Sequence, residues 1–215
     1  MSANVNGRRI WDISQPLRPD LPVWPGDTAF QQARTWQMDE GSPVNVSALT
    51  LSTHSGAHAD APLHYEAGAP DIASVDLEPY LGECLVVDAR RAKGAVRVGD
   101  LPAIRSVDRV LLRTFDSFPH DRWREDFTAI AAETIQWLAA QGVKLIGTDA
   151  PSIDPQTSKT MDAHKAVLNA GMRVLEGLVL DDVPAGRYEL IALPLPIVGG
   201  DASPVRAILR EIADG

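Results

Sequence analysis

The stretch that decides how this chain is organised reads Thr53-His54-Ser55-Gly56-Ala57-His58-Ala59-Asp60-Ala61-Pro62-Leu63-His64. The protein has five histidines, and three of them lie in this stretch together with one aspartate. Imidazole nitrogen and carboxylate oxygen are the ligands that a divalent metal such as zinc takes from proteins. The pattern therefore indicates a metal site.

The spacing of these residues constrains the local backbone. In an extended strand His54 and His58 would stand about 13 Å apart, at about 3.3 Å per residue, which is too far to share one ion. The chain must therefore curl between them, and Gly56 permits the unusual backbone angles that a curl needs. Asp60 is close enough to join His58, and Pro62 disfavours a helical continuation. We predict three ligands, His54, His58 and Asp60, and an open coordination position, which is typical of catalytic metals.

Simpler interpretations compete with this one. A histidine on an apolar strand is usually a hydrogen-bonded core group, and clustered histidines also occur in solvated loops. The tight spacing with Asp60 among glycine and alanine favours the metal. Two remote residues stay open on pattern alone. His164 falls in a predicted helix, where most histidines are surface residues, whereas Glu176 falls in an apolar run, where a carboxylate is costly to bury unless it is paired or binds a metal.

Length and composition narrow the class of protein. The 215 residues, 45% of them hydrophobic and 23% charged, predict one soluble domain spanning residues 1–215. A formal net charge of -9 argues against nucleic acid or an anionic membrane surface as partner. We expect no membrane span and no signal peptide. The single cysteine, Cys84, lies in an apolar run, which predicts a buried structural thiol and suits a reducing cytoplasm.

The order of predicted elements indicates an α/β fold with a mixed sheet and flanking helices. We expect strands at residues 8–14, 29–38, 43–53, 84–88, 108–114, 143–148, 187–194 and 204–210. We expect helices at residues 128–141 and 161–169, a helical turn at 78–80 and an apolar segment at 172–180. A stiff, proline-rich loop at 16–27 carries Trp24, which the pattern assigns equally to a pocket wall or to the edge of the core. A second stiff loop, at 149–155, follows a strand at its carboxyl end, where α/β folds tend to place their sites.

Other chemistries lack support in the sequence. It contains no Gly-x-Ser-x-Gly elbow, no phosphate-binding glycine-rich loop, no His-Glu-x-x-His helix and no Cys-x-x-Cys pair. A serine or cysteine nucleophile is therefore not indicated, whereas a metal-activated water is.

The segment from His54 to His64 resembles the signature of the cyclase-like metal-dependent hydrolases. Over nearly its full length the chain resembles the bacterial zinc-dependent kynurenine formamidases, and Ala57, where many other relatives have threonine, is typical of that subgroup. The supporting segments are Asp12-Ile13-Ser14-Gln15-Pro16-Leu17, Val23-Trp24-Pro25-Gly26-Asp27, Gly147-Thr148-Asp149-Ala150-Pro151-Ser152-Ile153-Asp154, Glu176-Gly177-Leu178 and Pro194-Leu195-Pro196.

This resemblance implies a swivelling β/β/α-type fold, a homodimer and a centre with two zinc ions. His54, His58 and Asp60 would hold the first ion. Asp60 would bridge to the second ion, and His164 and Glu176 would complete that site. The two residues that pattern alone left open thus acquire a role through the resemblance.

The resemblance also implies the reaction, which is hydrolysis of N-formyl-L-kynurenine to L-kynurenine and formate in tryptophan breakdown. Zinc-bound hydroxide would attack the formyl carbon, His64 would act as acid and base, and Trp24 would contact the substrate. Two alternatives remain. One is another amidase or lactam hydrolase of the superfamily, such as one that opens isatin. The other is a non-catalytic metal-binding module with a closed coordination sphere. His64 argues against this alternative, because such a module would not need it as a ligand.

Overall fold

The computed structural model describes residues 2–5 and 7–212. Its helices are α1 (Ala132–Ala140) and α2 (Asp162–Asn169), and short 3-10 turns lie at Pro62–His64, Glu78–Tyr80 and Val98–Asp100. The strands are β1 (Ser2–Val5), β2 (Arg8–Asp12), β3 (Gln31–Trp36), β4 (Val46–Thr50), β5 (His58–Asp60), β6 (Leu81–Asp88), β7 (Ala95–Val96), β8 (Arg109–Arg113), β9 (Ala129–Ile130), β10 (Leu145–Thr148), β11 (Arg173–Glu176), β12 (Gly186–Ile191), β13 (Ala202–Pro204) and β14 (Ile208–Arg210).

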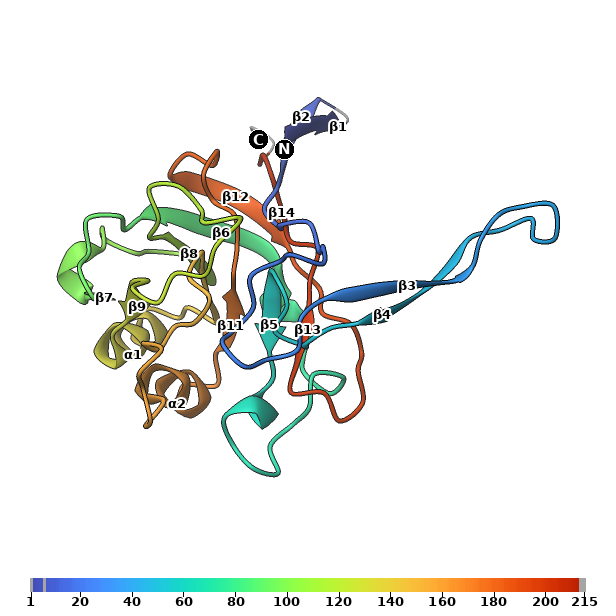
Figure 1. Ribbon diagram of the computed structural model, residues 1–215. Helices are drawn as coiled ribbons and strands as arrows, with labels where there is room; N and C mark the ends of the chain where they lie inside the picture. Colours follow the sequence, from blue (N-terminus) through green and yellow to red (C-terminus); the bar gives the residue numbers. More distant parts are fainter. Residues whose placement is uncertain (1, 6, 213–215) are drawn as a thin grey trace.

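A ten-stranded sheet forms the centre of the described part of the chain, in the order β1-β2-β14-β12-β6-β8-β10-β11-β5-β13. Strands β6, β8, β10 and β11 pair in parallel, and the strands on either side of them pair antiparallel. Parallel neighbours need a crossover connection, which α1 supplies between β8 and β10 and α2 supplies between β10 and β11. Both helices lie on the same side of the sheet (Figure 1). The predicted α/β fold with a mixed sheet is confirmed.

The two faces of the sheet bury separate apolar clusters, because side chains alternate along a strand. In β8, Val110 and Leu112 pack in the cluster that contains Ile135 of α1, whereas Leu111 belongs to the cluster on the opposite face. Cys84 of β6 is fully buried in that second cluster. Burial raises the pKa of its thiol to about 12, which confirms the predicted structural cysteine.

Strands β3 and β4 form a separate hairpin that projects from the body as an arm (Figure 1). Every residue of β3 is exposed, and beyond its root the arm carries Trp36 at 61% and Met38 at 59% exposure. A lone two-stranded hairpin is marginally stable in water unless something packs on it. The arm returns through Thr50 to His54, so its root leads directly into the predicted metal site.

Several element boundaries differ from the prediction. The helix expected at residues 128–141 begins only at Ala132, because Ala129–Ile130 pair in parallel with β7 as strand β9. Strands β1 and β13 were not predicted, since each is short and gains its partners from remote parts of the chain. Residues 58–60 also form a strand, where only a curl was expected. None of the described helices is long and apolar enough to cross a membrane.

Candidate metal centre and its pocket

Strand β5 carries two of the predicted ligands into the interior of the sheet. It pairs antiparallel with β11 on one side and β13 on the other, and this register places His58 opposite Glu176. As a result, His58 Nε2 lies 3.4 Å from Glu176 Oε2 and 3.5 Å from Asp60 Oδ1. All three residues are buried. A predicted ligand from the far end of the chain thus reaches the cluster through strand pairing.

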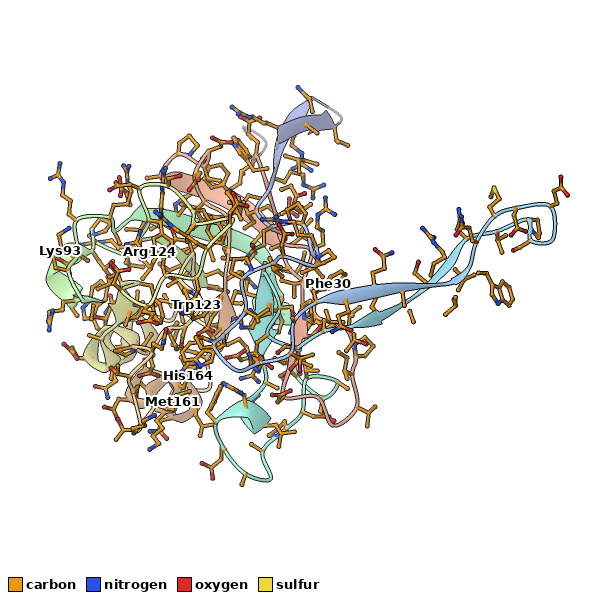
Figure 2. All side chains as sticks on the ribbon, viewed as in Figure 1. Phe30, Lys93, Trp123, Arg124, Met161 and His164 are labelled. Carbon is orange, nitrogen blue, oxygen red and sulfur yellow. The ribbon has the colours of Figure 1, made fainter. Side chains whose placement is uncertain are left out.

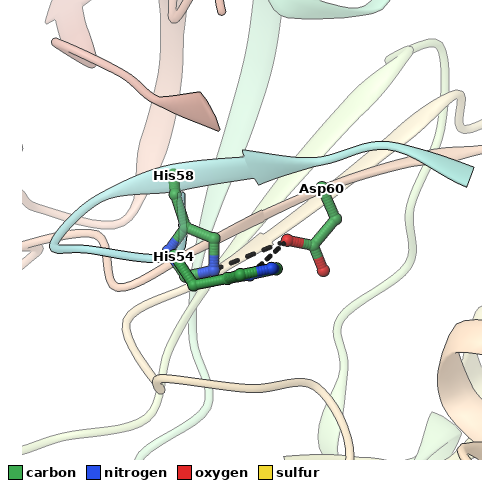
Figure 3. A group of neighbouring side chains, drawn as sticks. All are labelled: His54, His58 and Asp60. Atoms are coloured by element: carbon green, nitrogen blue, oxygen red, sulfur yellow. Dashed lines mark ion pairs between the residues drawn. The ribbon is translucent and has the colours of Figure 1, made fainter. Parts of the chain in front are cut away.

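The curl before β5 brings in His54. The Ser55 amide donates to the Ser52 carbonyl, and Gly56 adopts a φ of 67°, so the chain reverses before the strand begins. His54 Nδ1 then lies 3.1 Å from Asp60 Oδ1 (Figure 3). The predicted curl between His54 and His58 is confirmed.

Helix α2 supplies the last predicted ligand. His164 Nε2 lies 3.3 Å from Asp60 Oδ2 and 3.5 Å from Glu176 Oε1. The five residues expected to bind metal, His54, His58, Asp60, His164 and Glu176, therefore converge on one cluster, with Asp60 between the two groups of histidines.

The hydrogen bonds behind the cluster show that it fits a cation. His58 Nδ1 donates to the Gly56 carbonyl at 2.9 Å, since a carbonyl can only accept, and His164 Nδ1 lies 2.7 Å from Asp154 Oδ2. A neutral imidazole held in this way turns its Nε2 lone pair toward the carboxylates of Asp60 and Glu176, so a positive charge, either a proton or a metal cation, belongs between them.

Two atoms of this cluster have no hydrogen-bond partner among the described residues. His58 Nε2 and Asp60 Oδ1 are buried and lack a hydrogen bond, although they lie 3.5 Å apart and Asp60 Oδ1 lies 3.1 Å from His54 Nδ1. Buried polar atoms are nearly always satisfied, so such a pair calls for an explanation, and an ion held by nitrogen and oxygen donors provides it. His54 with His58 and Asp60, and Asp60 with His64 and His164, each have donor atoms within 4.8 Å of one another.

The electrostatics of the cluster lead to the same conclusion. Burial alone would lower the pKa of His54, but the Asp60 and Asp201 carboxylates outweigh it and raise that pKa to about 9. Burial would likewise raise the pKa of Asp60, yet His164 and His54 hold it well below its usual value. The negative potential that keeps protons on these imidazoles would equally attract a divalent cation.

Two carboxylates that the sequence analysis did not select hold the histidines in place. Asp154 accepts hydrogen bonds from the backbone amides of Ala163 and His164, each at 3.0 Å, besides its contact with the His164 ring. Asp201 Oδ2 lies 3.1 Å from His54 Nε2, and its other oxygen accepts from Thr53 Oγ1 at 2.8 Å. Asp154 lies in the loop predicted to border a site, whereas no local pattern in the sequence marks Asp201.

A cavity of about 530 Å³ opens onto the cluster. Its lining includes both remaining predicted site residues, His64 and Trp24. The His64 side chain is 30% exposed, and its Nδ1 lies 3.8 Å from Asp201 Oδ2. Burial lowers the pKa of His64.

Aromatic side chains form the wall of this cavity away from the cluster. Trp24 packs edge-on against Trp123, with ring centroids 5.4 Å apart, and near Phe127 at 6.4 Å. It therefore both lines the cavity and covers an aromatic cluster, so the two interpretations of its role are compatible. Figure 2 shows Trp123 and Met161, which also line the cavity, on the side of the molecule where His164 lies.

Residues 11–155 match the Cyclase family model, described as "Putative cyclase". A curated kynurenine formamidase of Erythrobacter litoralis (strain HTCC2594) is 69% identical over 214 residues, covering 100% of this chain and 99% of that protein. The chain belongs to the cyclase family and, within it, to the kynurenine formamidases. The predicted resemblance to the cyclase-like kynurenine formamidases is thereby confirmed.

Solved structures share the fold of this chain. A structure described as a potential metal-dependent hydrolase with cyclase activity aligns with a TM-score of 0.83 at 30% identity, covering 96% of this chain and 100% of that one. Isatin hydrolase A from Labrenzia aggregata aligns with a TM-score of 0.80 at 23% identity, covering 94% and 93% of the two chains. The second likeness concerns the fold alone.

One backbone contact under the cluster gives a testable prediction. Gly177 has a φ of 65°, and a Cβ added there would lie 2.5 Å from the carbonyl oxygen of Gly56, the acceptor of His58 Nδ1. Gly177→Ala should therefore destabilise the fold by roughly 2–4 kcal/mol, from the left-handed backbone and from the clash together. The free energy of unfolding in urea measures this loss.

Gly171→Ala is the matched control, because Gly171 has the same φ of 65° but nothing within 4 Å of an added Cβ. It should cost only about 1 kcal/mol. Equal losses in the two variants would show that the contact between Gly177 and Gly56 does not constrain the site.

Proposed function

We propose that this chain hydrolyses the formamide of N-formyl-L-kynurenine, giving L-kynurenine and formate, and so acts as an arylformamidase in tryptophan breakdown. The observation that carries the proposal is the full-length match to a kynurenine formamidase, joined to a cluster of imidazoles and carboxylates at an aromatic-walled cavity. Its volume of about 530 Å³ suits a small aromatic substrate. A cytoplasmic location fits the single, buried cysteine.

The proposed cofactor is zinc, with two ions per subunit. His54, His58 and Asp60 would hold one ion, and Asp60 would bridge to another held by His164 and Glu176. Bound zinc would supply a Lewis acid that polarises the formyl carbonyl and lowers the pKa of water to roughly 7.

The side chains around the cluster would carry out the remaining steps. His64 lines the cavity beside the cluster, and its Nδ1 faces Asp201, so Nε2 is the nitrogen left to exchange a proton. It would take a proton from the attacking water and return it to the aniline nitrogen as the C–N bond breaks, because an aryl amine leaves poorly as an anion. Trp24 would pack on the aromatic ring of the substrate.

The nearest rival activity is opening of the isatin lactam by the same fold. Turnover of N-formyl-L-kynurenine and of isatin by the purified protein, with and without a chelator, separates the two. We expect kcat/KM to be at least about a hundredfold higher for the formamide, and activity to vanish with chelator and return with zinc. A preference for isatin would favour the rival, and metal binding without turnover of either substrate would favour a non-catalytic module.

Two substitutions separate the metal ligands from the proton carrier. Asp60→Ala should empty both ion positions, because its carboxylate lies between the two groups of histidines. His64→Ala should keep the metal and lose turnover by about 10²- to 10⁴-fold. Metal content per subunit, measured by atomic emission, and kcat provide the readouts. Loss of metal from the His64 variant would reassign that histidine as a ligand.

We further propose a homodimer in which the arm formed by β3 and β4 packs on a second copy of the chain. The support is the exposed apolar surface of the arm, including Trp36, Met38 and Leu49, the last at 54% exposure. From Gln31 to the turn at 39–42 the arm reaches roughly 30 Å, at about 3.3 Å per residue. That length is enough to cross a large part of a neighbouring subunit.

A double substitution, Trp36→Ser with Met38→Ser, tests this assembly. It should raise the dimer dissociation constant at least about tenfold, because buried aromatic anchors dominate interfaces, while each subunit stays folded. Sedimentation velocity measures the shift. Val5→Ser is the control, since Val5 is 48% exposed on β1, well away from the arm (Figure 1). A monomeric parent protein, or an unchanged dimer in the double variant, would contradict the proposal.

A further inference from the structure

The cavity has two chemically distinct parts. At one end His54, His58, His64 and Glu176 form the proposed reaction centre. The loop at residues 115–124 contributes aromatic side chains and two arginines, Arg122 and Arg124. Among the described residues that line the cavity, no other arginine and no lysine is present.

The two arginines differ in their partners. Arg124 is bound to Asp126 through Nε and Nη2, at 2.7 and 2.8 Å. Arg122 forms no ion pair with any residue that the structure describes, and it is exposed. The charge of Arg122 helps to lower the pKa of Asp126, but that carboxylate already binds Arg124. The guanidinium of Arg122 thus keeps its donors available.

The acidic neighbour of Arg122 is likewise already bound. Asp121 accepts from Arg18 Nη2 at 2.5 Å, and the same nitrogen donates to the His120 carbonyl at 2.8 Å. Arg18 belongs to the proline-rich loop that also carries Trp24. This ion pair joins the two loops that line the cavity, and it occupies the carboxylate of Asp121, the residue before Arg122.

We infer that Arg122 binds the α-carboxylate of the amino-acid head group of the substrate. The inference rests on the proposed function, since the substrate then consists of an aryl formamide at one end and a charged head group at the other. Trp24 packs against Trp123, the residue after Arg122, so with the formamide at the cluster and the ring beside Trp24 the head group would lie near the loop of Arg122. A guanidinium fork matches a carboxylate in geometry, and a cation without an ion pair at an otherwise aromatic wall is suited to an anionic ligand.

A comparison of two substrates tests this assignment. N-formyl-L-kynurenine carries the head group, whereas 2'-formamidoacetophenone has the same aryl formamide and ketone without it. Arg122→Gln should lower kcat/KM for the first roughly tenfold, mainly through KM, because the lost contact is a charge-assisted hydrogen bond at a partly solvated site. It should leave kcat/KM for the second within about twofold.

Arg124→Gln is the matched variant, because its guanidinium lies on the same loop but is bound to Asp126. Whatever it does to the two substrates, it should not change the ratio of their kcat/KM values. Arg122→Lys should restore part of the ratio, since a cation remains without the fork. Added salt should raise KM for N-formyl-L-kynurenine with the parent protein and have little effect on the Arg122→Gln variant.

The outcomes separate this inference from the proposed function. If the parent protein hydrolyses N-formyl-L-kynurenine but Arg122→Gln leaves the ratio of the two substrates unchanged, the assignment of Arg122 is wrong and the activity stands. If the ratio of the two kcat/KM values falls in the Arg124→Gln variant instead, the substrate carboxylate binds Arg124. If the parent protein hydrolyses neither formamide, the proposed function and this inference fail together.

Discussion

The backbone pairing of the three-residue strand β5 fixes the geometry of the candidate site. Strand β5 lies between β11 and β13, and its ladder with β11 fixes which side chains from residues 58–60 and 173–176 meet. Because alternate residues of a strand point to opposite faces, a slip of one residue would turn His58 and Asp60 away from Glu176. The close approach of the Gly56 carbonyl to Gly177 fixes the same crossing from outside the ladder. The geometry of the cluster is therefore a property of the sheet more than of the loops around it.

The composition of the cluster has an energetic cost that the fold must offset. Asp60 and Glu176 are buried carboxylates, and isolated ions of this kind are expensive to remove from water. Shared protons from the surrounding imidazoles reduce this cost, and a divalent cation would reduce it further while freeing those protons. Asp154 and Asp201 hold His164 and His54 from behind, so the ring orientations do not depend on what occupies the space between them.

Sequence reasoning found the parts of this arrangement that are local. His54, His58 and Asp60 fall within one curl, so their spacing alone indicated a shared ion. His164 and Glu176 were assigned only by resemblance, because their positions depend on α2 and on the pairing of β11 with β5, which no local pattern encodes. Asp201 was missed for the same reason: β13 brings it to the cluster from near the end of the chain. The order of apolar segments predicted the α/β fold. It did not predict that β3 and β4 project as an arm, because their sequence pattern does not differ from that of strands in the sheet.

The burial of Cys84 has a practical consequence for work with this protein. It is the single cysteine of the chain and lies on β6, buried in the core. Its thiol ionises only well above neutral pH. Since the thiolate is the species that reacts, maleimides and mild oxidants should leave this thiol untouched in the folded protein. A cysteine introduced at the tip of the arm or on the loop of Arg122 would then be the only site to accept a fluorophore, with no need to remove the native one first.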